Sequence, residues 1–233
     1  MSRISVPRVA VIIPAAGSGK RMGLTENKVL LKVGGEPGLL HLIKLFSSIS
    51  SVQRLIVLVK KDQFTRVNKI LSPLNFPGFT LLEGGAERQD SVRIGLEYLK
   101  DEPPDWVLIH DGARPLVTPD LVQRVLQGLQ EYSSVVPALP ITDTVRKRSG
   151  TATQVIPRDG LYQVQTPQGF HWTPLWEAHQ TAFKTGFVGT DDAQLLENTG
   201  ISTHLVPGEF SNIKLTVAKD ALLAEVFFRL RQE

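Results

Sequence analysis

The sequence predicts an α/β fold built on a doubly wound, mostly parallel β-sheet. Five short apolar runs recur along the chain without alternating polar residues, so we expect them to be strands that are buried on both faces. Segments with helical periodicity lie between these runs. Strand and helix therefore alternate from the first residues onward, which is the order expected of parallel strands joined by right-handed crossovers.

The expected strands are these apolar runs, each of which has turn or polar residues at both ends. They cover residues 9–13, 55–59, 79–82, 106–110 and 134–139. Ligands of such sheets bind outside the carboxyl ends of the strands. The residues that directly follow these runs are therefore the first place to look for a site.

The clearest predicted helix follows Thr118, because Pro119 suits the first helical position and one apolar stripe follows it. The stripe consists of Leu121, Val122, Val125, Leu126 and Leu129. Other helices are expected over residues 39–46, 64–71, 92–99, 173–184 and 190–199, and from Ala218 onward. Short strands are expected near residues 202–206 and 213–217.

The stretch from residue 140 to 167 breaks this rhythm. It has β-rich segments and the turn pairs Ser149-Gly150 and Asp159-Gly160, but no helical stripe. We interpret it as a protruding β-arm within a single domain that spans residues 1–233. Its apolar positions are too few for a core of its own, so we expect it to pack against a second subunit. The alternative is an ordinary surface hairpin whose basic residues are solvated.

Composition excludes several classes of protein. A net charge of +3 without a run of five or six like charges gives no support for a nucleic-acid partner. The absence of cysteine excludes disulfide scaffolds, thiolate zinc sites and thiol nucleophiles. Pro14 interrupts the first apolar run, so no secretory signal or membrane span is expected. We expect a bacterial cytoplasmic protein, or a plastid stromal one in a photosynthetic eukaryote.

The loop after the first strand, with glycines at 17, 19 and 23, predicts a phosphate-binding turn. It does not match the dinucleotide fingerprint, because that pattern requires a third glycine at position 22, where this chain has Met22. It does not match the P-loop pattern either. Its amide groups can face an anion while Lys20, Arg21 and Lys28 add positive charge. The alternative is a tight turn with solvated cations.

Six motifs occur in order along the chain: "PAAGSGKRMG" followed by Lys28, then "GGAERQDSV", "HDGARP", "TPQGF", "TDDA" and "NIKLTVAKD". Together they resemble the 2-C-methyl-D-erythritol 4-phosphate cytidylyltransferase family of the sugar-nucleotidyltransferase superfamily. The resemblance runs from Val9 to about Asp220. It implies a homodimer joined by β-arms, Mg²⁺ as the cofactor, and transfer of CMP from CTP to 2-C-methyl-D-erythritol 4-phosphate, with release of diphosphate, in the non-mevalonate isoprenoid pathway.

The resemblance also implies roles for the charged residues. Arg21 and Lys28 are expected to contact the triphosphate and to stabilise the transition state of an in-line displacement that needs no protein nucleophile. Lys214 is expected to help from the far side of the site. Asp111 is expected to hold the metal, although Asp111-Gly112 is also a common turn pair. Arg114 is expected either to reach the nucleotide or to fix its loop by pairing with an acid.

Nucleotide binding is expected to involve small residues that let the backbone approach the cytosine ring. The alternative to cytosine binding by Ser91 is a structural role as the N-terminal cap of a helix. Arg88 and Asp90 beside it could likewise have structural roles. The nucleotide-binding positions implied are Ala15, Ala16, Gly17, Gly19, Gly85, Ser91, Asp111, Gly112 and Arg114.

The polyol phosphate needs a second cationic site. The resemblance implies that Thr144 and Arg158 of one subunit's arm lie over the other subunit's active site, where Thr166, Thr190 and Lys214 complete it. Thr142 competes with Thr144 for this role, because the two would share a face of one strand.

Two other functions remain open from the sequence. A ribitol 5-phosphate cytidylyltransferase shares the nucleotide chemistry, although its first loop more often reads "AGGTGTRMG". A non-catalytic nucleotide-binding protein could use the same fold. The residues needed for transfer, rather than for binding alone, favour an enzyme: Arg21, Lys28, Asp111 and Lys214. The five histidines show no zinc-site spacing.

Overall fold

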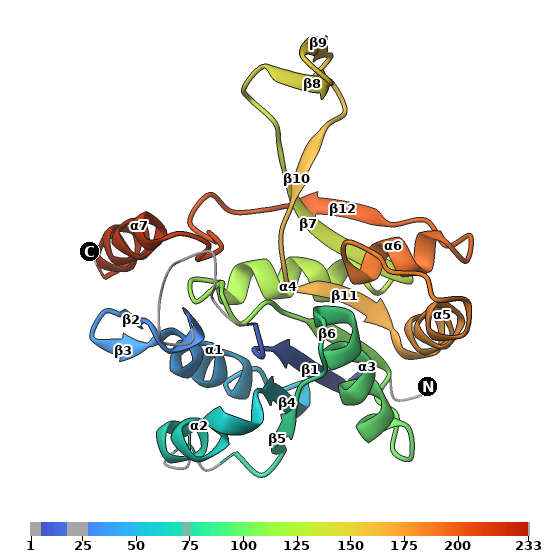
Figure 1. Ribbon diagram of the computed structural model, residues 1–233. Coiled ribbons are helices and arrows are strands. Elements are labelled where there is room, and N and C mark those ends of the chain that lie inside the picture. Colours follow the sequence, from blue (N-terminus) through green and yellow to red (C-terminus); the bar gives the residue numbers. More distant parts are fainter. Residues whose placement is uncertain (1–5, 18–27, 72–73, 75, 233) are drawn as a thin grey trace.

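The computed structural model of the chain describes residues 6–17, 28–71, 74 and 76–232. A central mixed sheet runs through the body of the molecule, and the strands follow the order β10-β7-β11-β6-β1-β4-β5, with β12 paired to β7 (Figure 1). Its strands are β1 (Val9–Pro14), β4 (Val52–Val59), β5 (Phe79–Glu83), β6 (Trp106–Ile109), β7 (Ser134–Pro140), β10 (Tyr162–Val164), β11 (Gln168–His171) and β12 (His204–Pro207).

Strands β6, β1, β4 and β5 form the parallel half of the sheet. Val11 of β1 pairs with Leu55 of β4 on one side and with Leu108 of β6 on the other. All five strands expected from the apolar runs are present, so the mostly parallel α/β prediction is confirmed. Strand β11, which pairs antiparallel with β6 and β7, was not predicted. It is four residues long and contains Gly169, and a glycine weakens the sequence signal of a strand.

Helices cover both faces of the sheet, as a doubly wound fold requires. On one face lie α1 (Gly38–Ser47), α2 (Phe64–Leu71) and α4 (Pro119–Gly128), and on the other lie α3 (Arg88–Leu99), α5 (Trp172–Thr185) and α6 (Asp192–Glu197). Each expected helix is found, and the Thr118 hydroxyl caps α4 by accepting from the Leu121 N–H at 3.0 Å. Helix α6 is shorter than expected because Asp191 caps it.

The alternation of side chains along β1 explains why both faces are apolar. Val11 and Ile13 pack in the core beneath α1 and α4, whereas Ala10 and Ile12 pack in the core beneath α3 and α5. These side chains are fully buried. A continuous apolar run therefore satisfies two cores at once.

A hairpin of β8 (Val145–Ser149) and β9 (Ala152–Ile156) stands away from the body at the top of Figure 1. Gly150 makes its turn with φ of 60°, in the left-handed region that favours glycine. Most residues of both strands are exposed. The protruding part lies between Ile141 and Leu161, whose backbones pair at its base. The chain then returns to the sheet through β10, which pairs antiparallel with β7, and Gln165 and Thr166 at the end of the predicted range are buried in the body.

The strand expected at residues 213–217 is absent, and this prediction is wrong. The segment is extended, but the backbone bond that ties it to the body runs from the Leu215 N–H to the Ala113 carbonyl at 2.8 Å and belongs to no ladder. Side chains also hold it, since Arg114 donates to the Asn212 carbonyl at 2.7 Å. The apolar residues that suggested a strand pack against α7 (Ala218–Leu230) in a small third cluster.

The remaining elements are short. They are η2 (Lys28–Leu30), β2 (Lys32–Val33), β3 (Glu36–Pro37) and η3 (Lys61–Gln63). Within the described residues, none of the helices combines the length and the apolar character needed to cross a bilayer.

Candidate active site

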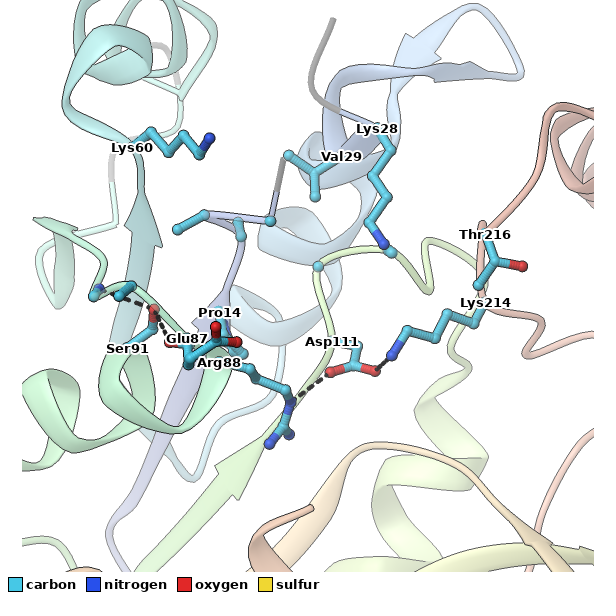
Figure 2. A pocket seen from close by; sticks show the side chains of 17 residues that line it. Pro14, Lys28, Val29, Lys60, Glu87, Arg88, Ser91, Asp111, Lys214 and Thr216 are labelled. Carbon is cyan, nitrogen blue, oxygen red and sulfur yellow. Dashed lines mark hydrogen bonds and ion pairs between the residues drawn. The ribbon is translucent and has the colours of Figure 1, made fainter. Parts of the chain in front are cut away.

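A pocket of about 560 Å³ opens at the carboxyl ends of β1, β4, β5 and β6. This is the position that the sheet order predicts for a ligand. Figure 2 shows its side chains converging from the strand ends, from η2 and from the segment before α7. The lining comprises Pro14, Ala15, Ala16, Gly17, Lys28, Val29, Lys60, Gly85, Ala86, Glu87, Arg88, Ser91, Asp111, Gly112, Ala113, Lys214 and Thr216.

Asp111 is the centre of the polar groups in this pocket. It follows β6, and each of its carboxylate oxygens faces a cation: Lys214 Nζ lies 2.6 Å from Oδ2 and Arg88 Nε lies 3.0 Å from Oδ1 (Figure 2). Burial disfavours the charged form of Asp111, but the Arg88 and Lys214 charges outweigh burial and lower its pKa. Asp111 is therefore an ionised carboxylate at neutral pH.

Arg88 is a pocket residue that the sequence suggested only as a structural one. It is the first residue of α3, directly after the loop that leaves β5. Burial disfavours its charge, yet the carboxylates of Asp192 and Asp111 raise its pKa above the ordinary arginine value. Its position after the carboxyl end of a parallel strand was the available signal.

Thr166 and His110 lie behind Asp111 and hold its backbone. Thr166 Oγ1 accepts from the Asp111 N–H at 3.1 Å and lies 3.2 Å from Nδ1 of His110, whose Nε2 lies 3.0 Å from the Arg114 carbonyl. This network assigns the imidazole as the neutral tautomer that donates from Nε2. Burial lowers the pKa of His110 to about 4, and the hydrogen bond to Arg114 opposes this only in part.

The expected base-reading residues Ala15, Ala16, Gly85 and Ser91 all line the pocket. The Ala15 N–H donates to the Leu58 carbonyl at 2.7 Å, and the Gly85 N–H donates to Ser91 Oγ at 3.1 Å. A Cβ on Gly85 would lie 2.3 Å from the Asp90 Cβ, so this loop requires a glycine. The alternative of Ser91 as helix cap is wrong: Glu87 caps α3, and the Ser91 hydroxyl donates to the Glu87 carbonyl at 3.2 Å.

Lysines supply further positive charge to the pocket. Lys28 of η2 and Lys60, which directly follows β4, both line it (Figure 2). Lys60 was not predicted, although its place at a strand end could have identified it. Gly17 and Gly112 lie in the pocket as expected. Gly19 and Arg21 fall outside the residues that the structure describes.

Arg114 is not among the residues that line the pocket, and within the described residues its hydrogen bonds go to backbone carbonyls instead of to an acid, so its contact with the nucleotide stays a prediction. Its guanidinium donates to the carbonyls of Asn212 at 2.7 Å and Val164 at 3.4 Å. Burial lowers its pKa from the ordinary arginine value. Arg114 therefore links the base of the arm to the segment that carries Lys214.

The other expected polyol-binding residues lie away from the pocket of their own chain. Thr166 is 5% exposed and engaged behind Asp111, and Thr190 donates its N–H to Gln194 Oε1 at 2.7 Å beside α6. Thr144 and Arg158 are on the arm, where Arg158 donates to the Thr142 carbonyl. The expectation that Thr142 and Thr144 share a strand face is wrong, because β8 begins at Val145.

Comparison with known proteins gives the family. The family model described as 2-C-methyl-D-erythritol 4-phosphate cytidylyltransferase matches residues 9–230. The chain belongs to this cytidylyltransferase family. The resemblance inferred from the six motifs is thereby confirmed, and with it the classes of enzyme and reaction: a CTP-dependent nucleotidyltransferase of isoprenoid biosynthesis.

Individual cytidylyltransferases resemble the chain over almost its whole length. The 2-C-methyl-D-erythritol 4-phosphate cytidylyltransferase of Bacillus mycoides is 38% identical over 96% of this chain and 99% of its own. The enzyme of that name from Thermus thermophilus has a solved structure that is 35% identical, with a TM-score of 0.76 over 94% of this chain and 98% of that one.

A relative of different length is the bifunctional IspD/IspF enzyme of Chelativorans sp. strain BNC1. It is 41% identical over 94% of this chain, which spans 54% of the length of that protein. The chain thus corresponds to about half of this bifunctional relative.

The pocket of this cytidylyltransferase offers a magnesium ion the carboxylate of Asp111, but not a complete set of protein ligands among the described residues. The described residues contain no group of three or more histidine, cysteine or acidic side chains that could hold a metal. Magnesium is usually held by one or two carboxylates together with substrate phosphates and waters. Asp111 can serve as that carboxylate, because an ionised carboxyl group has about four lone-pair positions and two cations do not use them all.

Proposed function

We propose that this chain transfers CMP from CTP to 2-C-methyl-D-erythritol 4-phosphate and releases diphosphate. A phosphate oxygen of the polyol attacks the α-phosphorus of CTP, the new P–O bond forms, and the bond to the departing diphosphate breaks. No group of the protein needs to become covalently attached. The observation that carries this proposal is the cluster of Lys28, Arg88, Asp111 and Lys214 at the carboxyl ends of the strands, in a chain of this family.

The chemistry of phosphoryl transfer calls for positioning and charge compensation. We assign Lys28, together with Arg21 in the glycine turn, to the triphosphate. Lys214 approaches Asp111 from the side opposite to Arg88 and is assigned to the phosphate of the polyol (Figure 2). A preorganised cation at the transferring phosphate contributes on the order of 3 kcal/mol to stabilising the transition state.

Asp111 is the residue that would hold Mg²⁺ in this pocket. When bound, the ion would neutralise charge on the phosphate oxygens. Asp111 has a second task without the ion, since its carboxylate holds Lys214 and Arg88 in place.

Base selection is assigned to the loop of Gly85 and Ser91 and to Ala15, Ala16 and Gly17. All of these residues line the pocket. Their small size lets the backbone approach a pyrimidine ring and leaves little room for a purine. Gly19, which follows β1 in the sequence, and Gly112, which follows Asp111, complete the set of nucleotide-binding residues in this proposal.

We assign the arm, which the sequence places at residues 140–167, to a homodimer interface. Its β8–β9 hairpin is exposed and stands away from the body, and none of the arm's cations lines the pocket of its own chain. Thr144 and Arg158 would then reach the partner's pocket and bind the polyol phosphate, with Thr166 and Thr190 arranging the receiving side. A cytoplasmic location in a bacterium agrees with the bacterial relatives.

The test is turnover of the purified chain with CTP, Mg²⁺ and each polyol phosphate. We expect diphosphate release with 2-C-methyl-D-erythritol 4-phosphate and much slower release with ribitol 5-phosphate. Equal or exclusive turnover of ribitol 5-phosphate would identify the alternative enzyme. CTP binding without turnover of either substrate would instead identify a nucleotide-binding protein.

A further inference from the structure

Two buried titratable residues behind the pocket have no role in the function proposed above. Asp192 begins α6 and His179 lies within α5, and each is 1% exposed. His179 Nε2 lies 3.1 Å from Asp192 Oδ1. Neither residue lines the pocket. A buried carboxylate is costly unless it is paired, so the partners of Asp192 indicate what it does.

The second partner of Asp192 is Arg88. Arg88 Nη1 lies 2.7 Å from Asp192 Oδ2, while Nε of the same guanidinium lies 3.0 Å from Asp111 Oδ1. A planar guanidinium that is bound at two edges cannot turn without losing one of them. The direction in which Arg88 meets Asp111 is therefore set from behind by Asp192.

The backbone around this pair is fixed as well. Gln89, the residue after Arg88, donates from Nε2 to the Phe187 carbonyl and accepts from the Gly189 N–H, both at 3.0 Å. These two bonds join the start of α3 to the loop before α6. Asp192 and Arg88 thus belong to two elements that are connected beside the ion pair.

Charge balance leads to the same conclusion. Burial disfavours the ionised form of Asp192, but the Arg88 charge and the His179 hydrogen bond outweigh it and lower its pKa. Asp192 and Asp111 together balance Arg88 and Lys214, so loss of one carboxylate leaves a cation without its counter-ion. Without Asp192, Arg88 would lose the contact that sets its direction and would turn away from Asp111 toward solvent.

We propose that Asp192 and His179 are positioning residues that act through Arg88 to orient the Asp111 carboxylate. The chain of contacts runs from His179 to Asp192, Arg88, Asp111 and Lys214. Asp192 touches neither substrate, and its effect on turnover depends on Arg88. This inference rests on the proposed function, because the orientation of Asp111 matters only if Asp111 serves the transfer.

The experiment is a double-mutant cycle in the full-length chain. Asp192→Asn removes the charge at constant size, and Arg88→Gln removes the cation. We expect each single change to lower kcat on the order of tenfold, as a misplaced group does. Asp192→Asn should add little to Arg88→Gln, because the group it positions is already gone. An equal loss of kcat from Asp192→Asn in both backgrounds would overturn the proposal.

A matched control separates positioning from general loosening. Leu175 lies one turn before His179 on α5 and is buried in the hydrophobic core beneath α3, α5 and α6, so Leu175→Ala should lower the unfolding midpoint and leave kcat unchanged. If Asp192→Asn does not fold, His179→Leu replaces it in the cycle, with a smaller loss and the same dependence on Arg88. A loss from His179→Leu that persists in full in the Arg88→Gln background would contradict the proposal.

A readout without turnover distinguishes this inference from the proposed function. A crystal structure of Asp192→Asn, or of His179→Leu, should show Arg88 displaced from Asp111. An Arg88 that keeps its place on Asp111 in these variants would overturn the inference even for an active enzyme. An inactive wild-type chain would overturn the proposed function. The displacement of Arg88 could still be measured in that case, because the crystal structures do not depend on turnover.

Discussion

Lys214 Nζ lies 2.6 Å from Asp111 Oδ2, although 103 positions separate the two residues in the sequence. Asp111 is at the end of a buried strand, whereas Lys214 is on an extended segment that belongs to no sheet. Their contact joins the two sides of the pocket. It also keeps the ammonium group of Lys214 ready beside the reacting phosphates in the proposed mechanism.

Lys214→Ala is expected to lower kcat by roughly a hundredfold, which corresponds to about 3 kcal/mol of transition-state stabilisation. Steady-state kinetics with saturating CTP measures this change in kcat. Lys219, which is exposed on α7 five positions later, supplies the matched control, and Lys219→Ala should keep wild-type kcat. A Lys214→Ala enzyme with wild-type kcat would remove Lys214 from the mechanism.

Arg158→Ala is expected to raise the KM for the polyol phosphate and to spare the KM for CTP, because Arg158 lies on the arm and not in the pocket of its own chain. Mixing the Arg158→Ala protein with the Lys28→Ala protein tests whether an arm acts on the pocket of its own chain or on that of the partner. If arms act on the partner's site, random exchange of protomers restores about a quarter of the wild-type rate at limiting polyol phosphate, since one site in each mixed dimer is intact. No recovery would mean that each arm serves its own chain.

The lowered pKa of His110 predicts that the protein loses stability in mild acid. Its pKa is about 4 in the fold, against about 6.5 in an unfolded chain, so the unfolded state binds more protons between these values. Stability is complete above about pH 6.5 and falls as the pH decreases toward 4, by at most about 3 kcal/mol. Urea unfolding at several pH values measures this slope. His110→Gln should flatten it, and an unchanged slope in that variant would refute the assignment.

Arg114→Ala is expected to lower the free energy of unfolding by about 2–3 kcal/mol, because charged hydrogen bonds to two backbone carbonyls are lost. Denaturant unfolding measures the change. Arg229, exposed on α7 and paired with Glu225, is the control, and Arg229→Ala should change stability by less than about 0.5 kcal/mol. Unchanged stability together with a raised KM for CTP would support the nucleotide-contact role.

The strands and helices around the pocket could be predicted because each has a local cause. The apolar run of β1 needs two covered faces, and Thr118 with Pro119 specifies the start of α4. Gly17 and Asp111 could be placed for the same reason, since each follows a buried strand. The short strand β11 and the unpaired segment at 213–217 could not, because pairing partners decide them.

The sequence by itself determined the layers of the fold, the edge of the sheet where the pocket opens, and the family, since all three are encoded in local patterns and motifs. Only the tertiary structure decided that Arg88 belongs to the pocket, that Arg114 does not, and that Asp192 and His179 stand behind Arg88. A guanidinium or carboxylate takes its role from the charges that burial brings within hydrogen-bond distance. Those neighbours come from other elements, so no pattern along the chain records them.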